Sequence, residues 1–380
     1  MKVAYPMRVD ALDKPGGDLL LMREYLQRCT QAAAKRGIPF EGVISTSLNP
    51  DFSDFDVIHL TNIDRPVDLY RQFKAAKQSG KKIVLTPLHH SYQEIALYER
   101  QGRGGLIGLF SGIIGYSTLD ALRSLVKSIK YPELRSATLE LVLEGVREGQ
   151  SQILLGVDVN LVAADKELAD IENELCKLPP DRVLCIRNGF EMPQFGSLHP
   201  PSERDIDICV MGRIESRKNQ IAILEALESL GLGATFIGYE NPNHKRYCDR
   251  FKEMIAGSRS HYLGGVPFEQ VNSYLARSRV HVAASWFEVS SRLDIEAYVL
   301  GCRVVASICG GTSELLRQDA YYVDPASKES IVQRILEALK SSHDGTVNSI
   351  DLTSGAIETW DQIAERLLDI YLNKAISHRN

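Results

Sequence analysis

The sequence lacks several features that would place it in a class directly. Among 380 residues there is no uninterrupted apolar run of about eighteen, so no segment is expected to span a membrane. The seven cysteines include no Cys-x-x-Cys pair, which favours free thiols in a reducing compartment over disulfides or a zinc site. A net charge of −5 argues against a nucleic-acid-binding surface. The first residues, MKVAYP, lack a signal-peptide pattern, so we expect a cytoplasmic protein.

Short apolar runs rich in Val and Ile recur along the chain and alternate with helical patterns. Runs of this length, separated by helices, are typical of parallel sheets that are covered on both faces. The predicted strands are 2–5, 55–60, 82–86, 159–164, 182–187, 207–212, 234–238, 280–285 and 303–307. The fold class is therefore α/β, with two Rossmann-like doubly wound domains.

A domain boundary is expected near 190–205, where three prolines and one glycine interrupt the pattern. The chain is also too long for a single ordinary core. This boundary divides the protein into an N-terminal domain, 1–195, and a C-terminal domain, 204–345. After a second interruption at 343–355, an amphipathic helix over 356–375 could belong to either domain.

The predicted strand 207–212 ends in Gly212-Arg213 and leads into a helical pattern that includes Lys218. The carboxyl end of a strand that feeds a helix is where α/β folds bind ligands. Arg213 and Lys218 suit a diphosphate there, because Arg can form paired hydrogen bonds with phosphate oxygens and Lys adds a mobile charge. The alternative interpretation is a solvated basic patch at a loop end.

Two glutamates, Glu288 and Glu296, bound the stretch EVSSRLDIE after the predicted strand 280–285. Ser290 or Ser291 is expected to cap the following helix, which puts Glu288 in the loop and Glu296 in the second turn. The N–H groups at the start of this helix would form an anion site, and carboxylates accept hydrogen bonds from sugar hydroxyls. The alternative is a capping acid and a surface acid without a ligand.

Several stretches of the second half occur together in the order found in one enzyme family. They read GRIESRKNQIAILEAL, SWFEVSSRLDIEAYVLGCRVVAS, GGTSELL and YYVDPAS. Residues 206–342 thereby resemble the retaining GT-B glycosyltransferases of family four, which show Gly-Arg before Lys, Glu-x7-Glu and Gly-Gly-x-x-Glu. In the first half, GGD at 16–18, the pair His89-His90 and RNG at 187–189 resemble family features more loosely.

The resemblance implies roles for four residues of the C-terminal half. Arg213 and Lys218 would bind the donor diphosphate. Glu296 would hold the ribose hydroxyls, and Glu288 the hydroxyls of the transferred sugar. In this family the last helix crosses back, which assigns 356–380 to the N-terminal domain.

Other donor contacts are also implied by the resemblance. Ser290 and Ser291 lie in the loop that touches sugar and phosphate, where the family has Gly and an aromatic or apolar residue; this departure leaves the donor's identity open. Gly16 and Gly17 would let the N-terminal loop approach the phosphates.

The implied reaction is a retaining glycosyl transfer from a nucleotide-diphosphate sugar to a glycan or glycolipid acceptor, in surface polysaccharide biosynthesis. Its transition state resembles an oxocarbenium ion, and the leaving phosphate takes the acceptor proton. The resemblance makes Glu288 and either His89 or His90 the candidate catalytic residues, with the histidine lining the sugar and acceptor side. No cofactor or metal is expected, since the Asp-x-Asp triplets 54–56 and 205–207 lie at strand entrances rather than at carboxyl ends.

Two rival functions remain open from sequence alone. The first is a sugar-nucleotide epimerase or phosphorolytic enzyme of the same fold. The second is a non-catalytic protein that binds nucleotide sugars. The segment 104–130 also has two interpretations: a core helix beside the acceptor site, or a peripheral contact with the inner face of a membrane, because Arg123, Lys127 and Lys130 follow its apolar part.

Overall fold

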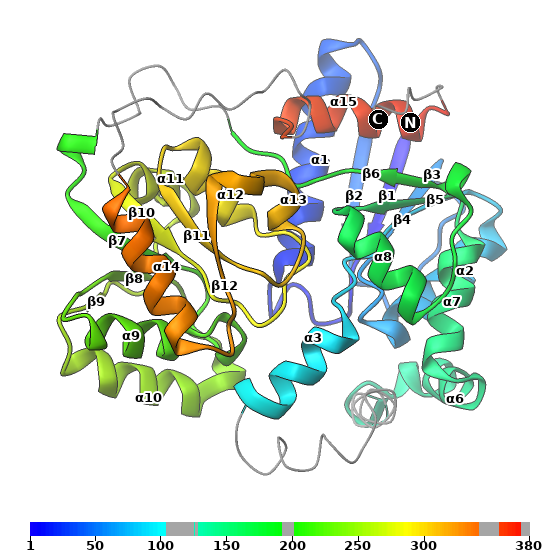
Figure 1. Cartoon of the computed structure of the whole chain (residues 1–380). Helices are drawn as coiled ribbons and strands as arrows, with labels where there is room; N and C mark the ends of the chain where they lie inside the picture. The colour runs from blue at the N-terminus through cyan, green and yellow to red at the C-terminus, as the bar shows by residue number, and fades with distance from the viewer. Residues whose placement is uncertain (104–124, 126–127, 192–200, 342–356, 374–380) are drawn as a thin grey trace. The chain divides into compact units, whose positions relative to one another are not determined.

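The computed structural model describes residues 1–103, 125, 128–191, 201–341 and 357–373 (Figure 1). The chain forms two compact units, and each contains a six-stranded parallel sheet flanked by helices. Unit 1 comprises Met1–Tyr92, Ile113–Arg187 and Glu358–Asn380, and unit 2 comprises Gln93–Gly112 and Asn188–Ile357. This confirms the predicted α/β class with two doubly wound domains.

In unit 1, the strands are β1 (Lys2–Pro6), β2 (Glu41–Ser45), β3 (Val57–Thr61), β4 (Lys82–Thr86), β5 (Val159–Val162) and β6 (Val183–Cys185). Its helices are α1 (Gly17–Lys35), α2 (Pro66–Ser79), α6 (Arg135–Glu144), α7 (Val146–Gly156), α8 (Asp165–Glu174) and α15 (Trp360–Tyr371). Short 3₁₀ turns lie at Pro132–Leu134 and Pro180–Arg182. Helix α3 (Tyr92–Leu97) starts at the last residue of the first segment of this unit.

In unit 2, the strands are β7 (Ile206–Met211), β8 (Thr235–Ile237), β9 (His261–Tyr262), β10 (Ser278–Val282), β11 (Arg303–Ser307) and β12 (Ala320–Val323). Its helices are α9 (Gln220–Ser229), α10 (Lys245–Ala256), α11 (Phe268–Ala276), α12 (Arg292–Val299), α13 (Thr312–Leu316) and α14 (Lys328–Lys340). The π-helical turn η1 (Tyr98–Gly102) follows α3, and 3₁₀ turns lie at Pro201–Glu203, Ser216–Lys218, Pro242–His244 and Arg317–Asp319.

The strand orders place the ligand-binding edge of each sheet. Unit 1 has the order β2-β1-β3-β4-β5-β6, and unit 2 has β12-β11-β10-β7-β8-β9. The chain order therefore reverses between β1 and β3 in unit 1, and between β7 and β10 in unit 2. Loops at the carboxyl ends of such strand pairs diverge and leave room for a ligand.

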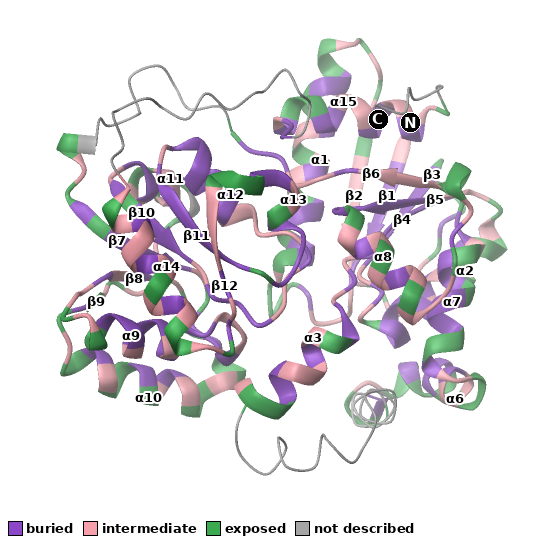
Figure 2. Ribbon diagram, in the orientation of Figure 1, coloured by how far each residue is buried: buried purple, intermediate pink, exposed green. Residues whose placement is uncertain are grey.

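Each sheet is buried between two layers of helices. β3 and β11 are buried along their whole length (Figure 2). Helices carry buried residues on one face and exposed residues on the other, as amphipathic sequences should. In unit 2, α9 supplies Leu224 and Leu227 to one core layer, and both are fully buried.

The C-terminal helix α15 packs in unit 1 against α1. Ile363, Leu367 and Ile370, three members of the predicted apolar stripe, lie in the same buried cluster as residues of α1. At the edge of this contact, Arg36 forms ion pairs with Glu365 and Asp369 at 3.0 and 2.8 Å. The helix after 356 therefore belongs with the N-terminal half of the chain.

Three strands and one segment boundary differ from the sequence prediction. β2, β9 and β12 were not predicted; β9 has only two residues, and β2 is an edge strand without a fully buried position. The segment Gln93–Gly112 belongs to unit 2, although the predicted N-terminal domain ran without interruption to 195. Its contacts with unit 2 are long-range, and local periodicity does not encode them.

Candidate nucleotide-sugar site

The reversal point of unit 2 gathers the loops that were predicted to bind a donor. β7 and β10 are hydrogen-bonded neighbours, although about seventy residues separate them along the chain. The loop after β7 carries Arg213 and Lys218, and the loop after β10 carries Glu288. Sheet topology thus brings the two predicted motifs to one edge.

The loop after β7 is shaped by tight backbone contacts. Gly212 adopts φ +148°, which favours glycine, and a side chain at Gly238 would collide with the Gly212 carbonyl. Ser216–Lys218 then forms a 3₁₀ turn, and Asn219 adopts a left-handed conformation (φ +60°) before α9 begins. The Asn219 amide donates to the Pro325 carbonyl at 2.9 Å, which fixes this turn against the chain after β12.

Lys218 and Glu288, which come from two different predicted motifs, are in direct contact. Lys218 Nζ forms an ion pair with Glu288 Oε1, and Arg217 Nη1 lies 3.0 Å from the same oxygen. Arg217 also donates to the Phe287 carbonyl at 3.1 Å, while the Trp286 N–H donates to the Arg217 carbonyl at 2.9 Å. The 3₁₀ turn after β7 and the loop after β10 are therefore joined through backbone and side chains.

Glu215 is a buried carboxylate beneath these cations. It accepts hydrogen bonds from Arg217 and from Asn241, the latter at 2.5 Å. Burial alone would raise the pKa of Glu215, but Arg217, Asn241, Lys218 and Arg213 outweigh it and lower the pKa. Burial lowers the pKa of Arg217, yet Glu288 and Glu215 outweigh this effect and raise it. Glu215 and Arg217 therefore both stay charged around neutral pH.

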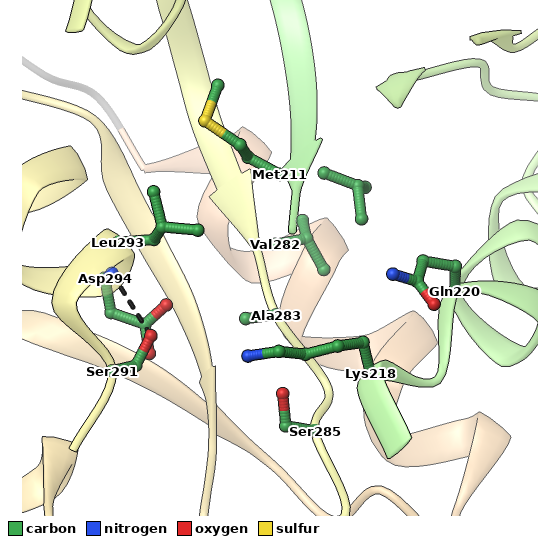
Figure 3. Close-up of a pocket in the computed structure, with 10 residues that line it drawn as sticks. Met211, Lys218, Gln220, Val282, Ala283, Ser285, Ser291, Leu293 and Asp294 are labelled. Atoms are coloured by element: carbon green, nitrogen blue, oxygen red, sulfur yellow. Dashed lines mark hydrogen bonds between the residues drawn. The ribbon is translucent and has the colours of Figure 1, made fainter. Parts of the chain in front are cut away.

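A pocket opens beside Lys218 (Figure 3). It is lined by Val210 and Met211 of β7, Val282 of β10, Lys218, Gln220, Ala283, Ser285, Ser291, Leu293 and Asp294. The wall thus combines the carboxyl ends of the two strands, the Lys218 stem and the first turn of α12. It offers an amine, hydroxyls and apolar surface together, which is a lining typical of small-molecule sites.

Helix α12 is fixed at both ends by the expected devices. Ser291 is its N-cap and accepts from the Asp294 N–H at 3.4 Å, so Ser291, rather than Ser290, caps the helix. Gly301 adopts φ +81°, and the N–H groups of Gly301 and Cys302 donate to the carbonyls of Tyr298 and Ala297. This is a Schellman motif.

Glu296 lies in the second turn of α12, as predicted. Glu296 is only 4% exposed, and Arg292 Nε lies 2.6 Å from Glu296 Oε1. Leu293 and Asp294 of the first turn of α12 line the pocket, and Glu296 lies one turn further along the helix. A role in holding ribose would require Arg292 to share this carboxylate, and that role stays a prediction.

In unit 1, the predicted glycines lie at the corresponding reversal point. Gly17 is the first residue of α1 and has open space around its Cα hydrogen, whereas a side chain at Gly16 would meet the Asp18 carboxylate. Asp18 is bound by Arg8 Nε at 3.1 Å and by the Asn62 amide at 3.0 Å. The loop is thus held by an ion pair between Arg8 and Asp18 and by the Asn62 amide, and none of these contacts was predicted from the sequence.

The two histidines after β4 differ sharply. His89 is 1% exposed, and its Nδ1 and Nε2 lie 3.0 and 2.8 Å from carboxylate oxygens of Asp64 and Glu174. Both ring nitrogens of His89 are thus engaged by carboxylates; which of the two histidines contacts a substrate stays a prediction. His90 has a side chain 26% exposed, and its Nδ1 lies 2.7 Å from Asp64.

The surroundings of His89 determine its charge. Burial lowers its pKa, but Asp64 and Glu174 outweigh burial and raise the pKa to about 10. Glu167 accepts from the His89 N–H at 2.8 Å, and burial raises its pKa to about 7. The loop that presents His90 is therefore held by a buried imidazolium.

The Asp-x-Asp triplet 205–207 lies at the start of β7, the strand entrance where it was predicted. Asp205 forms an ion pair with Arg277, and Asp207 forms one with Arg279. The segment 104–130 lies almost wholly outside the described residues. Among the residues that are described, no helix combines the length and apolar character needed to cross a membrane.

Sequence reasoning missed Arg217 and Glu215, although they hold Lys218 and Glu288 in place. Arg217 was readable as a second cation next to Lys218 in the stretch ESRK. Glu215 carried no such signal, because its importance comes from burial under Arg217 and Asn241.

Comparison with solved structures identifies the class. The chain aligns with the sucrose-phosphate synthase of Thermosynechococcus elongatus over 98% of both chains, with a TM-score of 0.67 and 15% identity. It aligns with the Anabaena protein HepE, solved in complex with UDP and glucose, over 98% of this chain and 100% of that one (TM-score 0.66, 13% identity). The fold is that of the GT-B glycosyltransferases.

Sequence comparison finds similarity to one family in part of the chain. Residues 198–349 match the family model of glycosyl transferases group 1. The GPI3 subunit of phosphatidylinositol N-acetylglucosaminyltransferase from Saccharomyces cerevisiae is 23% identical over 212 residues, which cover 52% of this chain and 47% of the yeast protein. The match thus spans about half the length of the curated relative. Together with the fold, these findings support a group 1 glycosyltransferase.

Proposed function

We propose that the protein transfers a sugar from a nucleoside-diphosphate sugar to a glycan or lipid-linked acceptor with retention of anomeric configuration. The single observation that carries the proposal is the contact of Lys218 and Arg217 with Glu288 at the reversal point of unit 2. Cations for a diphosphate and a carboxylate for sugar hydroxyls are held together there, beside a pocket.

The donor is proposed to lie along the pocket, with its diphosphate near Lys218 and Arg213. The N–H groups at the start of α12 add to this site, because a helix N-terminus attracts anions. Glu288 would accept hydrogen bonds from the sugar, and its ion pairs orient the carboxylate. Ser285 and Ser291 line the same pocket and supply hydroxyls.

In the proposed reaction, the bond between the anomeric carbon and the leaving phosphate breaks as the acceptor oxygen approaches from the same face. The acceptor proton passes to the leaving phosphate oxygen, so atoms and charge balance without a protein base. Negative charge grows on the phosphate, and fixed cations such as Lys218 stabilise it more than they stabilise the ground state.

These cations also underlie a proposal of metal-independent transfer, since they can neutralise the leaving diphosphate. Turnover with excess EDTA should equal turnover with added Mg²⁺. A complete loss in EDTA that Mg²⁺ restores would contradict this part of the proposal.

For the acceptor side, we propose His90 as the histidine that contacts substrate, because its side chain is partly exposed and His89 is buried. The yeast relative is named for a phosphatidylinositol acceptor, which supports a lipid-linked acceptor here. A role in surface polysaccharide or glycolipid synthesis, at the cytoplasmic face of a membrane and with 104–130 as a peripheral contact, is part of the same proposal.

A donor screen tests the function. Thermal unfolding should rise by a few degrees with one of UDP-glucose, UDP-N-acetylglucosamine, GDP-mannose or ADP-glucose, since a ligand that binds the native state stabilises it. Products formed with that donor and candidate acceptors should show, by NMR, the anomeric configuration of the donor. An inverted product would exclude retention.

The rivals predict other outcomes. Conversion of the donor into another nucleotide sugar without acceptor would indicate an epimerase. Binding without either transfer or slow donor hydrolysis would indicate a non-catalytic protein. No thermal shift with any nucleotide sugar would overturn the proposal.

A further inference from the structure

A short helical segment from the first half of the sequence is built into the donor-binding unit. From Gln93 on, α3 and the π-helical turn η1 belong to unit 2. In η1 the Arg103 N–H donates to the Tyr98 carbonyl at 2.9 Å, five residues back. Such π turns are rare and are found frequently at functional sites.

Tyr98 in this segment contacts both loops that carry the proposed donor ligands. Tyr98 is 5% exposed, and its hydroxyl lies 2.5 Å from Ser216 Oγ. Ser216 is the first residue of the 3₁₀ turn that ends at Lys218. The Tyr98 ring lies edge-on to Phe287, the residue before Glu288, with centroids 5.4 Å apart. One side chain therefore bridges the turn of Lys218 and the loop of Glu288.

Two further contacts tie the segment to the same loops. A side chain at Gly102 would come within about 2.5 Å of the Trp286 ring, so η1 lies directly on this indole. The Gly310 N–H donates to Glu94 Oε1 at 3.3 Å, and Gly310 itself packs on the Glu288 carbonyl. Three loops of the site thus rest on one segment.

We infer that Tyr98 is a positioning residue for donor binding: through Ser216 and Phe287 it fixes the spacing between Lys218 and Glu288. This inference rests on the proposed function. Tyr98 itself need not touch the donor. Its hydroxyl sets the position of the 3₁₀ turn, and its ring sets that of the loop after β10.

The test compares two tyrosines. Tyr98→Phe removes only the hydroxyl that reaches Ser216. Tyr70→Phe is the matched control, because Tyr70 is also 5% exposed and donates to Glu144 Oε2 at 3.0 Å, in a contact within unit 1 that involves neither donor loop. Binding of UDP, GDP and ADP is measured by calorimetry, and the tightest ligand serves as probe, alongside donor KM, kcat and melting temperature.

Tyr98→Phe should weaken binding of the probe, and raise donor KM, by about three- to tenfold, the range of one net hydrogen bond. Tyr70→Phe should lower the melting temperature about as much as Tyr98→Phe does, without changing the dissociation constant of the probe. Ser216→Ala breaks the same contact and also the contact of Ser216 Oγ with His244 Nδ1 at 3.0 Å, so adding Tyr98→Phe to it should weaken binding no further.

Three results are decisive. Equal dissociation constants for wild type and Tyr98→Phe would overturn the inference while leaving the proposed function intact. Additive effects in the double-mutant cycle would also overturn it, because the hydroxyl would then act elsewhere. Wild-type protein that binds none of the three nucleotides would overturn the proposed function and the inference with it.

Discussion

The two units share one architecture but differ in the charged side chains of the loops at the carboxyl ends of their strands. The comparison is between the loops after β7 and β10 in unit 2 and the loop after β4 in unit 1. In unit 2, Arg217 and Lys218 meet on the Glu288 carboxylate. In unit 1, the loop after β4 holds a single buried cation, His89, between Asp64 and Glu174. The same sheet thus supports a site suited to a diphosphate in one unit and a carboxylate-rich site in the other.

This difference has a physical consequence for ligand choice. A nucleoside diphosphate carries negative charge and is attracted to the cations of unit 2. The carboxylates around His89 would repel it, while carboxylates and the partly exposed His90 suit neutral hydroxyl groups. This difference in charge is consistent with the proposed placement of the donor in unit 2, and the place of the acceptor stays a proposal.

The largest expected effect concerns the buried cation of unit 1. His89→Gln leaves Asp64 and Glu174 without their shared positive partner, and breaking a buried ion pair costs on the order of 3 kcal/mol. The free energy of unfolding near pH 7 should fall by about that amount. Hydrogen exchange in α8, which carries Glu174, should accelerate, whereas exchange in α12 should stay unchanged.

The pH dependence sharpens this prediction. The folded-state pKa of His89 is raised to about 10 from an ordinary value near 6.5, so its stabilisation is complete below about pH 6.5 and is lost as pH rises through about 10. His89→Gln should remove this alkaline loss. His59→Gln is the control: His59 is also fully buried in unit 1, and burial lowers its pKa to about 3, so it titrates on the acid side.

A wild-type stability that stays flat between pH 7 and 10 would show that His89 is not a buried cation. If His59→Gln abolished the loss of stability at alkaline pH, the titrating group would be His59 and not His89. Either result would remove the contrast drawn between the two units.

The next effect concerns the cations of unit 2. Lys218→Ala should lower kcat/KM about a hundredfold or more, equivalent to about 2.7 kcal/mol, because a fixed charge at the leaving phosphate is lost. The control is Lys245→Ala, since Lys245 is an exposed lysine of α10 in an ion pair with Asp249. Unchanged kinetics in Lys218→Ala would remove this residue from the site.

How much of this could be read from sequence differs between the units. Five-residue runs such as 82–86 and 303–307 became β4 and β11 without change, because each has three consecutive buried apolar residues at its centre. Lys218 and Glu288 were found through their motifs, and the structure places them in contact. The same reading could not choose between His89 and His90, since burial and ion pairing, and not residue type, separate them.

What the sequence could not supply were contacts between distant segments. Glu215 supports the site because Arg217 and Asn241 close over it, and Tyr98 reaches Ser216 across more than a hundred residues of chain. Neither contact leaves a periodicity or a motif. Two-residue β9 is missed for a related reason: its strand conformation comes from its neighbour β8 rather than from its own composition.

The smallest expected effects test whether the two units respond independently. Gly301→Ala replaces the left-handed glycine that ends α12 and should cost about 1 kcal/mol. Thr359→Ala removes the capping box of α15 at a similar cost. Gly301→Ala should accelerate hydrogen exchange in α12 and weaken donor binding, because α12 carries Ser291 of the pocket. Thr359→Ala should accelerate exchange in α15 alone and leave donor affinity unchanged; a loss of affinity in this variant would mean that the packing of unit 1 is coupled to the donor site.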